Sequence, residues 1–304
     1  MYGFGISFRR MTDLPSCILS RDRRRLNLYS VCRYNGQPPV NQILMLTAQN
    51  IKEGHITFDG NRLFTTFHSA LNTAEKPTIV FLHEALGSIA QWRDFPATLA
   101  EITGFNVFAY DRLGHGLSDA HSKEKDNTFL HHEAWTVLPF VLEQFQIRNP
   151  ILWGHSDGGS IALLYASRFP AAALVIEAAH VFVETVTLEG IMSAQPRKEF
   201  LIERQSRYHG DKTEKLWNSW VDTGLDESFA DWNIEALLPE IKCPALIIQG
   251  EGDEYGTKEQ VIRIAKGIGE RAKVLMIPDC THTPHRDARE IVLKAGVEFL
   301  NKYV

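Results

Sequence analysis

The heptapeptide LWGHSDG, residues 152–158, is the most informative stretch of this chain, because it joins an apolar, strand-like run to a helix-compatible run through a serine. A turn this tight leaves no room for side chains two residues before and after its centre. Gly154 and Gly158 lack those side chains, so Ser156 can adopt a strained backbone conformation with its hydroxyl exposed. The free amides at the start of the following helix favour negative charge at the same place. The heptapeptide therefore predicts a nucleophilic serine.

A serine hydroxyl becomes a good nucleophile only when a base removes its proton and a carboxylate orients that base. Both groups follow downstream, each after a strand-like run. Asp253 follows the apolar run at 244–249, and His282 follows the run at 273–277. Loops at the carboxyl ends of parallel strands are where such a sheet places its site. We therefore predict a catalytic triad of Ser156, Asp253 and His282.

Other residues compete for two of these roles. His285 lies three residues past His282 and could be the base instead. Glu177 ends another strand-like run and could be the acid, as could the two glutamates that flank Asp253. The Gly-x-x-Asp spacing after residue 250 favours Asp253. His282 is favoured as the base because His285 lies at the start of the last predicted helix.

Four motifs besides the serine turn resemble those of the α/β-hydrolase fold superfamily, and the resemblance extends over roughly residues 52–304. FLHEALGS at 81–88 resembles the His-Gly-x-x-Gly-Ser oxyanion loop, and YDRLGHGLSD at 110–119 resembles the Asp-x-x-Gly-x-Gly-x-Ser turn. The run 244–253 resembles the acid strand, and THTPH at 281–285 resembles the Gly-His-x-Pro-His loop. The resemblance implies a serine hydrolase with a helical cap over its site.

The resemblance also implies an oxyanion hole formed by the backbone amides of Ala85 and Asp157. The oxyanion loop departs from the family pattern, because Glu84 replaces the usual glycine. A carboxylate that faced an oxyanion would oppose catalysis. We therefore expect Glu84 to turn away and to pair with Arg93 or Arg112.

The alternation of strand and helix patterns predicts a mostly parallel, twisted sheet of about eight strands with helices on both faces. Residues 55–67 read as a hairpin with an Asp-Gly-Asn turn. Further strands are predicted at 78–83, 106–110, 150–155, 172–177, 244–249 and 273–277, and helices at 131–146, 157–168, 257–268 and 286–302.

Residues 45–304 should form the hydrolase domain, with the helical cap as an insertion at about 181–238. An apolar pocket with a few polar groups is the usual small-molecule site. No basic cluster in 45–304 suggests that phosphate or nucleic acid binds. The tentative pocket residues are aromatic and lie in or near the predicted cap: Trp92, Phe182, Trp217 and Trp220.

Residues 1–44 differ in charge from the rest of the chain. They contain seven arginines, no lysine and two aspartates, for a net charge of +5. Subtracting them from the whole-chain totals of 32 basic and 37 acidic residues leaves 25 basic and 35 acidic residues in 45–304, a net charge of −10. We interpret 1–44 as an arginine-rich extension outside the fold, and an organelle-targeting leader is the alternative.

The composition is typical of a soluble enzyme: 304 residues, of which 44% are hydrophobic and 23% charged. No apolar run approaches the ~20 residues that a membrane span requires. The four cysteines form no Cys-x-x-Cys pair and no metal-ligand spacing, so we expect free thiols in a reducing compartment, the cytoplasm. We expect neither a metal nor a cofactor.

The triad and the resemblance together predict a serine hydrolase that cleaves a small apolar ester through an acyl-enzyme intermediate. The same triad could serve carbon–carbon bond hydrolysis or cofactor-free haloperoxidation, and a hydrolase-like ligand receptor is a third alternative. The expected partner is a small-molecule substrate, without nucleic acid or membrane. The substrate's identity and the oligomeric state stay open, because one fold hosts many functions.

Overall fold

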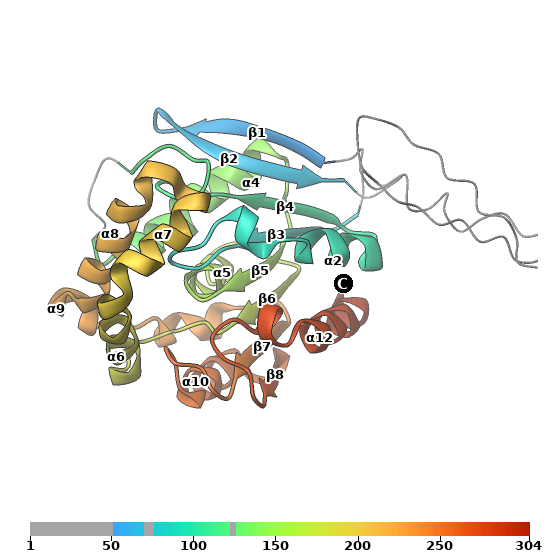
Figure 1. Ribbon diagram of the computed structural model, residues 1–304. Coiled ribbons are helices and arrows are strands. Elements are labelled where there is room, and N and C mark those ends of the chain that lie inside the picture. Colours follow the sequence, from blue (N-terminus) through green and yellow to red (C-terminus); the bar gives the residue numbers. More distant parts are fainter. Residues whose placement is uncertain (1–50, 70–75, 122–125) are drawn as a thin grey trace, which may run out of the picture. The chain divides into compact units, whose positions relative to one another are not determined.

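Eight strands pair into one sheet within residues 51–69, 76–121 and 126–304, which are the residues that the computed structural model describes (Figure 1). The order across the sheet is β1-β2-β4-β3-β5-β6-β7-β8. Strands β3 to β8 are parallel, and β2 runs antiparallel to both β1 and β4. The predicted mostly parallel sheet is confirmed. The arginine-rich extension predicted at 1–44 lies outside the described residues.

The first two strands, β1 (Ile51–Phe58) and β2 (Asn61–His68), form the predicted hairpin. Asp59 and Gly60 connect them with φ values of 47° and 76°. Positive φ at both central residues defines the turn type whose twist matches that of the strands. Strands β3 to β7 are buried at every position, as expected for a parallel sheet that is covered on both faces. The parallel strands are β3 (Thr78–Leu82), β4 (Asn106–Tyr110), β5 (Ile151–His155), β6 (Ala173–Glu177), β7 (Ala245–Gly250) and β8 (Ala272–Ile277).

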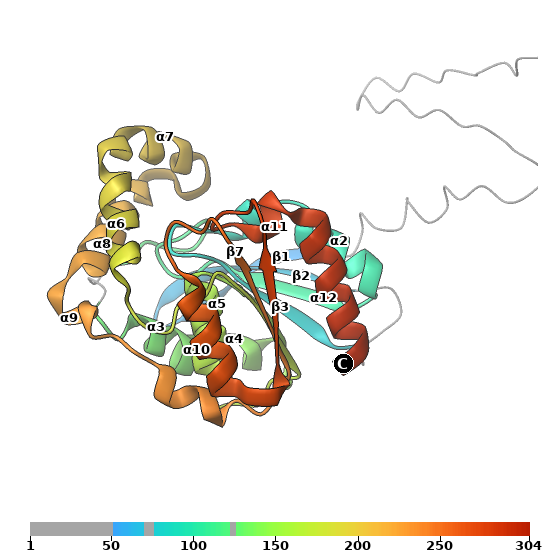
Figure 2. The same cartoon turned by 90° about the horizontal axis from the view of Figure 1, so that it is seen from below.

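Helices cover both faces of the sheet. Figure 2 shows α2 (Phe95–Thr103) and α12 (Arg289–Tyr303) together on one side. On the other side lie α4 (Leu138–Gln144), α5 (Asp157–Ala166) and α10 (Lys258–Ile268). The connection from a strand through a helix to the next parallel strand places these helices in layers above and below the sheet.

Three helical segments differ from the sequence-based expectation. The helix predicted over 131–146 is divided into α3 (Phe129–His132), a π-helical stretch (Glu133–Val137) and α4. Helix α2 was not predicted, although a proline in its first turn and left-handed Gly104 at its end are helix boundary signals. The last predicted helix is preceded by a separate turn, α11 (Pro284–Asp287).

A helical segment between β6 and β7, which we call the cap, contains α6 (Thr185–Ala194), α7 (Lys198–His209), α8 (Thr213–Leu225) and α9 (Glu227–Ala230). In Figure 1 these four helices are grouped at one end of the sheet. None of the helices within the described ranges combines the length and the hydrophobicity that a membrane span requires.

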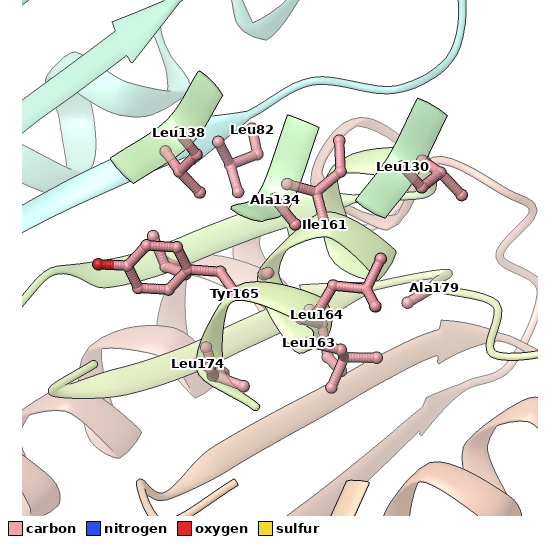
Figure 3. Packing of buried hydrophobic residues seen from close by; sticks show 14 of the residues in the cluster. Leu82, Leu130, Ala134, Leu138, Ile161, Leu163, Leu164, Tyr165, Leu174 and Ala179 are labelled. Atoms are coloured by element: carbon pink, nitrogen blue, oxygen red, sulfur yellow. The ribbon is translucent and has the colours of Figure 1, made fainter. Parts of the chain in front are cut away.

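The alternation of side chains along each strand divides the core into two layers. On β3, Val80 and Leu82 belong to the layer under α5, whereas Ile79 and Phe81 belong to the layer under α2 and α12. Figure 3 shows the first layer, where side chains of α5 such as Ile161 lie among those of the neighbouring elements. These layers hold the strand ends rigidly, and the candidate site is formed at the carboxyl ends of β3, β5, β7 and β8.

Candidate active site

The turn from β5 to α5 has the strained geometry that its glycines predict. Ser156 has φ 53° and ψ −118°, a combination that is unfavourable for a residue with a side chain. A Cβ atom on Gly154 would overlap the carbonyl of Gly158, and one on Gly158 would overlap the carbonyl oxygen of Leu82. Glycine is therefore required at both positions, and the turn projects Ser156 at the start of α5.

The structure brings the three predicted triad residues together from the ends of three strands. His282 Nε2 lies 2.9 Å from Ser156 Oγ, and His282 Nδ1 lies 2.8 Å from Asp253 Oδ1. Asp253 Oδ1 also accepts a hydrogen bond from the backbone N–H of Tyr255 at 2.9 Å. The hydroxyl, imidazole and carboxylate thus form the continuous hydrogen-bonded chain that a serine nucleophile needs.

The surroundings of His282 favour its protonated form. Burial by itself lowers the pKa of His282, but the hydrogen bond and the charge of Asp253 offset this effect, with smaller contributions from Glu84 and Glu254. The resulting pKa is above the ordinary value for histidine. An imidazole that gains a proton readily is suited to accept the proton of Ser156.

A second buried histidine holds the loop of His282 in place. His155 Nε2 lies 2.7 Å from the backbone carbonyl oxygen of His282, so the ring donates and the carbonyl accepts. Burial lowers the pKa of His155 well below its ordinary value. The ring therefore stays neutral at neutral pH and adds no charge beside the triad.

The competing residues Glu177 and His285 contact each other instead of joining the triad. Glu177 Oε2 accepts hydrogen bonds from the backbone N–H of His285 at 2.7 Å and lies 3.1 Å from His285 Nδ1. Glu177 Oε1 accepts from Trp153 Nε1 at 2.6 Å. The Glu177 side chain is fully buried. Its carboxylate therefore supports the histidine loop through these hydrogen bonds and does not contact His282 itself.

The amides predicted to form an oxyanion hole are both free. Within the described part of the chain, neither Ala85 nor Asp157 donates its backbone N–H to another group. Asp157 is the first residue of α5, where amides have no intrahelical partner. Ala85 lies in a loop held by Arg112, whose Nη2 donates to the backbone oxygen of Glu84 at 2.6 Å. Both amides are available for an anionic oxygen, and their role stays a prediction.

The Glu84 side chain lies differently from the expectation. Within the described residues its carboxylate pairs with neither Arg93 nor Arg112, so the predicted ion pair was wrong. The guanidinium of Arg112 is instead occupied by backbone carbonyls of the loop and by Asp157, at 3.5 Å. Burial raises the pKa of Glu84, and the charge of nearby His282 partly offsets this rise.

The predicted Asp-x-x-Gly-x-Gly-x-Ser turn supports the oxyanion loop. Asp111 accepts hydrogen bonds from the backbone N–H of Ile89 at 2.7 Å and of Leu117 at 2.8 Å. Gly116 has φ 45°, and a Cβ atom there would overlap the Asp111 carboxylate. This motif is therefore a structural clamp between two loops and contributes no reacting group.

The tentative pocket residues occupy different environments. Trp92 is buried, with its ring centroid 4.3 Å from that of His285, and it lines a cavity together with Glu84 and His155. Phe182 is covered by Arg263, whose guanidinium carbon lies 4.4 Å from the ring centroid. Trp217 is buried within the cap against Trp220, at 5.2 Å. Their predicted contact with substrate stays a prediction.

Tyr255 is a residue beside the site that the sequence argument did not single out. Its ring centroid lies 4.8 Å from that of His282 and 6.3 Å from that of Trp220, so it connects the cap with the triad. Burial raises the pKa of Tyr255 to about 12, which keeps its hydroxyl protonated. Its position two residues after Asp253, on the acid loop, is the signal that could have identified it.

Comparison with known proteins agrees with this architecture. Residues 77–204 match the family model described as alpha/beta hydrolase fold. This chain belongs to the α/β-hydrolase fold superfamily. It is 27% identical over 205 residues to serine hydrolase BPHL of Homo sapiens, a match that covers 64% of this chain and 69% of that protein.

Other relatives match over more of the chain. The bifunctional esterase/perhydrolase DCH of Acinetobacter calcoaceticus is 23% identical over 269 residues, which is 77% of this chain and 95% of that protein. The crystal structure of a membrane phospholipase A superposes with a TM-score of 0.69 at 19% identity, over 86% of this chain and 90% of that one. At such identity the structural match shows the fold alone. The protein is thus an α/β-fold hydrolase whose relatives include serine hydrolases and esterases.

Proposed function

We propose that this hydrolase cleaves a small carboxylic ester through a covalent acyl-enzyme on Ser156. The observation that carries the proposal is the hydrogen-bonded chain from Ser156 Oγ through the His282 ring to Asp253, with donor–acceptor distances of 2.9 and 2.8 Å. These distances are within the range in which a proton moves between nucleophile and base. The free amides of Ala85 and Asp157 support the same proposal.

In this proposal His282 accepts the proton of Ser156 while Oγ attacks the ester carbonyl. The carbonyl oxygen becomes negative and is bound by the amides of Ala85 and Asp157. His282 then donates its proton to the leaving alcohol, which leaves an acyl group on Ser156. Water repeats the sequence with His282 as base, releases the acid and restores the hydroxyl. Asp253 holds the imidazole tautomer and stabilises its charged form.

Perhydrolysis at the same site is a second candidate. It is favoured by the similarity to a relative named as a bifunctional esterase/perhydrolase. Hydrogen peroxide would replace water in the second step, attack the same acyl group and release a peracid. The first step and all residue roles stay unchanged, so esterase activity would precede and accompany it.

The proposal is tested with a fluorophosphonate probe and aryl esters of graded acyl length. We expect covalent labelling and turnover of short esters by the wild-type protein. Ser156→Ala should abolish both and leave the fold intact, since the glycines and not the hydroxyl set the turn. Ser206→Ala, at an exposed serine of the cap, is the matched control and should label normally. A folded wild-type protein that resists the probe and hydrolyses none of the esters would overturn the proposal.

A further inference from the structure

A cavity of about 330 Å³ is lined by residues that directly precede or follow the site residues in the chain. Its wall contains the sequence neighbour of each element of the site: Glu84 before Ala85 of the oxyanion loop, His155 before Ser156, Glu254 after Asp253, and Thr283 after His282. The opposite wall is formed by α7 of the cap. A group bound in this cavity would therefore contact the residues that adjoin the site residues in the chain.

The cavity is lined by arginines from three separate segments. Arg204 and Arg207 come from α7, and Arg197 directly precedes that helix. Arg93 follows the oxyanion loop, and Arg286 is in α11 beyond the histidine loop. Only two carboxylates, those of Glu84 and Glu254, are on the same wall. The lining thus has an excess of positive charge, although residues 45–304 as a whole are acidic.

The α7 arginines have no carboxylate partner among the described residues. The guanidinium of Arg204 lies over Phe200, 5.5 Å from the ring centroid, and that of Arg207 lies over Tyr208 at 4.7 Å. Arg197 forms no ion pair within the described part of the chain either. Like charges three residues apart on a helix repel each other, so this arrangement does not stabilise α7. A ligand that neutralises the arginines would remove that repulsion.

We infer that the cavity binds a carboxylate carried by the substrate itself, so that the enzyme acts on a half-ester of a dicarboxylic acid. This inference rests on the proposed ester hydrolysis and names its substrate class. Guanidinium groups bind carboxylates through paired hydrogen bonds in one plane, which positions as well as attracts them. The carboxylate would occupy the arginine side of the cavity while the ester reaches Ser156.

A singly charged carboxylate suits this cavity better than a phosphate does. Glu84 and Glu254 face the same space, and their negative charges would repel a dianion more strongly than a monoanion. Burial raises the pKa of Glu84, so this side chain gains a proton more readily than an exposed glutamate does. A protonated Glu84 could donate a hydrogen bond to a bound carboxylate. A half-ester is a different substrate class from the small apolar ester that the sequence predicts.

The catalytic test compares 4-nitrophenyl half-esters of glutaric, adipic and suberic acid with the methyl 4-nitrophenyl diesters of the same acids. We expect kcat/KM of the wild-type enzyme to favour at least one half-ester over its neutral partner by about tenfold or more, as charge-assisted hydrogen bonds allow. That ratio should fall towards one in the Arg204→Ala/Arg207→Ala double variant. It should also shrink at about 1 M salt, where charges are screened within ~3 Å.

Arg148→Ala removes an exposed arginine far from the cavity lining and should leave the ratio unchanged. Turnover of every diester at least as fast as its half-ester would overturn the inference while leaving the proposed ester hydrolysis intact. An unchanged ratio in the double variant would overturn it as well.

A binding test separates the inference from catalysis. Ser156→Ala protein is titrated calorimetrically with glutarate, adipate, suberate and inorganic phosphate. We expect saturable binding of at least one dicarboxylate, lost when the double arginine substitution is added. If such binding is seen but no ester is cleaved by the wild-type enzyme, the proposed function fails and the carboxylate site stands. Binding of none of the dicarboxylates, or tighter binding of phosphate than of any of them, would overturn the inference.

Discussion

At the scale of single residues, the two carboxylates near the histidine loop have different partners and therefore different expected effects. Asp253 contacts the His282 ring, whereas Glu177 contacts His285 and Trp153 beneath it. Loss of the first should disturb proton transfer. Loss of the Glu177 carboxylate should lower the stability of the fold, because buried N–H donors would be left without their acceptor.

Asp253→Asn should lower kcat by about 10⁴-fold, because an amide supports the wrong imidazole tautomer. Glu177→Gln should lower the free energy of unfolding by about 1–3 kcal/mol, since it replaces an acceptor of buried N–H groups. The same substitution should keep kcat within about tenfold of the wild-type value. Urea denaturation and ester hydrolysis measure the two effects. A folded Glu177→Gln enzyme as inactive as Asp253→Asn would show that Glu177 acts in proton transfer.

The pH dependence should reflect the protonation of His282. Only the neutral ring accepts the Ser156 proton, so activity is lost as pH falls through the pKa of His282. Asp253 and the nearby glutamates hold this pKa above its ordinary value of about 6.5. The acidic limb of kcat/KM for a neutral aryl ester should therefore have its midpoint above pH ~6.5. A midpoint clearly below that value would contradict the expectation, and Asp253→Asn should move the midpoint downwards.

At the scale of elements, the β5–α5 turn depends on steric room at its glycines as well as on its backbone hydrogen bonds. A methyl group at Gly158 would meet the backbone of β3, which cannot move without disturbing the centre of the sheet. Gly54, in the edge strand β1, has open space where its Cβ would lie. A side chain should therefore be tolerated at Gly54 and not at Gly158.

Gly158→Ala should destabilise the fold by about 3 kcal/mol or more, since overpacking against backbone is costly. Gly54→Ala is the matched control and should change the free energy of unfolding by less than about 1 kcal/mol. We expect a small increase in stability, because alanine lowers the conformational entropy of the unfolded chain. Chemical denaturation of the two variants measures both values. Equal stabilities would show that the turn relaxes around an added methyl group.

At the scale of the whole molecule, His209 connects the cap to the loops that contain Leu86 and Gly116. Its Nδ1 accepts from the backbone N–H of Gly116 at 2.9 Å, and its Nε2 donates to the backbone oxygen of Leu86 at 3.0 Å. Burial lowers the pKa of His209 to about 4. The connection requires the neutral ring, because a protonated Nδ1 cannot accept the Gly116 hydrogen bond.

The stability that His209 contributes should be fully present above pH ~6.5, the unfolded-state pKa, and should be lost as pH falls towards 4. At ~1.36 kcal/mol for each pKa unit, the loss is up to about 3 kcal/mol. Urea denaturation between pH 7.5 and 4.5 should show a smaller pH dependence for His209→Gln than for the wild type. His132→Ala, at an exposed histidine, should behave as the wild type does. Parallel wild-type and His209→Gln profiles would contradict this role.

The fold and the elements that position the triad could be predicted from the amino-acid sequence, because the constraints behind them are local. Glycine spacing permits the strained turn at Ser156, continuous apolar runs specify buried parallel strands, and chain order assigns the acid and histidine loops. Helix α2 was missed although its boundary signals are present.

Which side chains contact each other depends on how distant segments pack, and the sequence pattern does not show this. Asp253 and Glu177 both follow buried strands, and their pairing with His282 or His285 depends on side-chain directions at neighbouring strand ends. The pairing predicted for Glu84 failed because Arg112 is held by backbone carbonyls that no sequence pattern displays. Arg93 and Arg286 lie far apart in the chain and form no basic run, yet folding places both on one cavity, which His155 also lines. Charge clusters of this kind arise from the packing of separate segments, and pattern reading along the chain does not detect them.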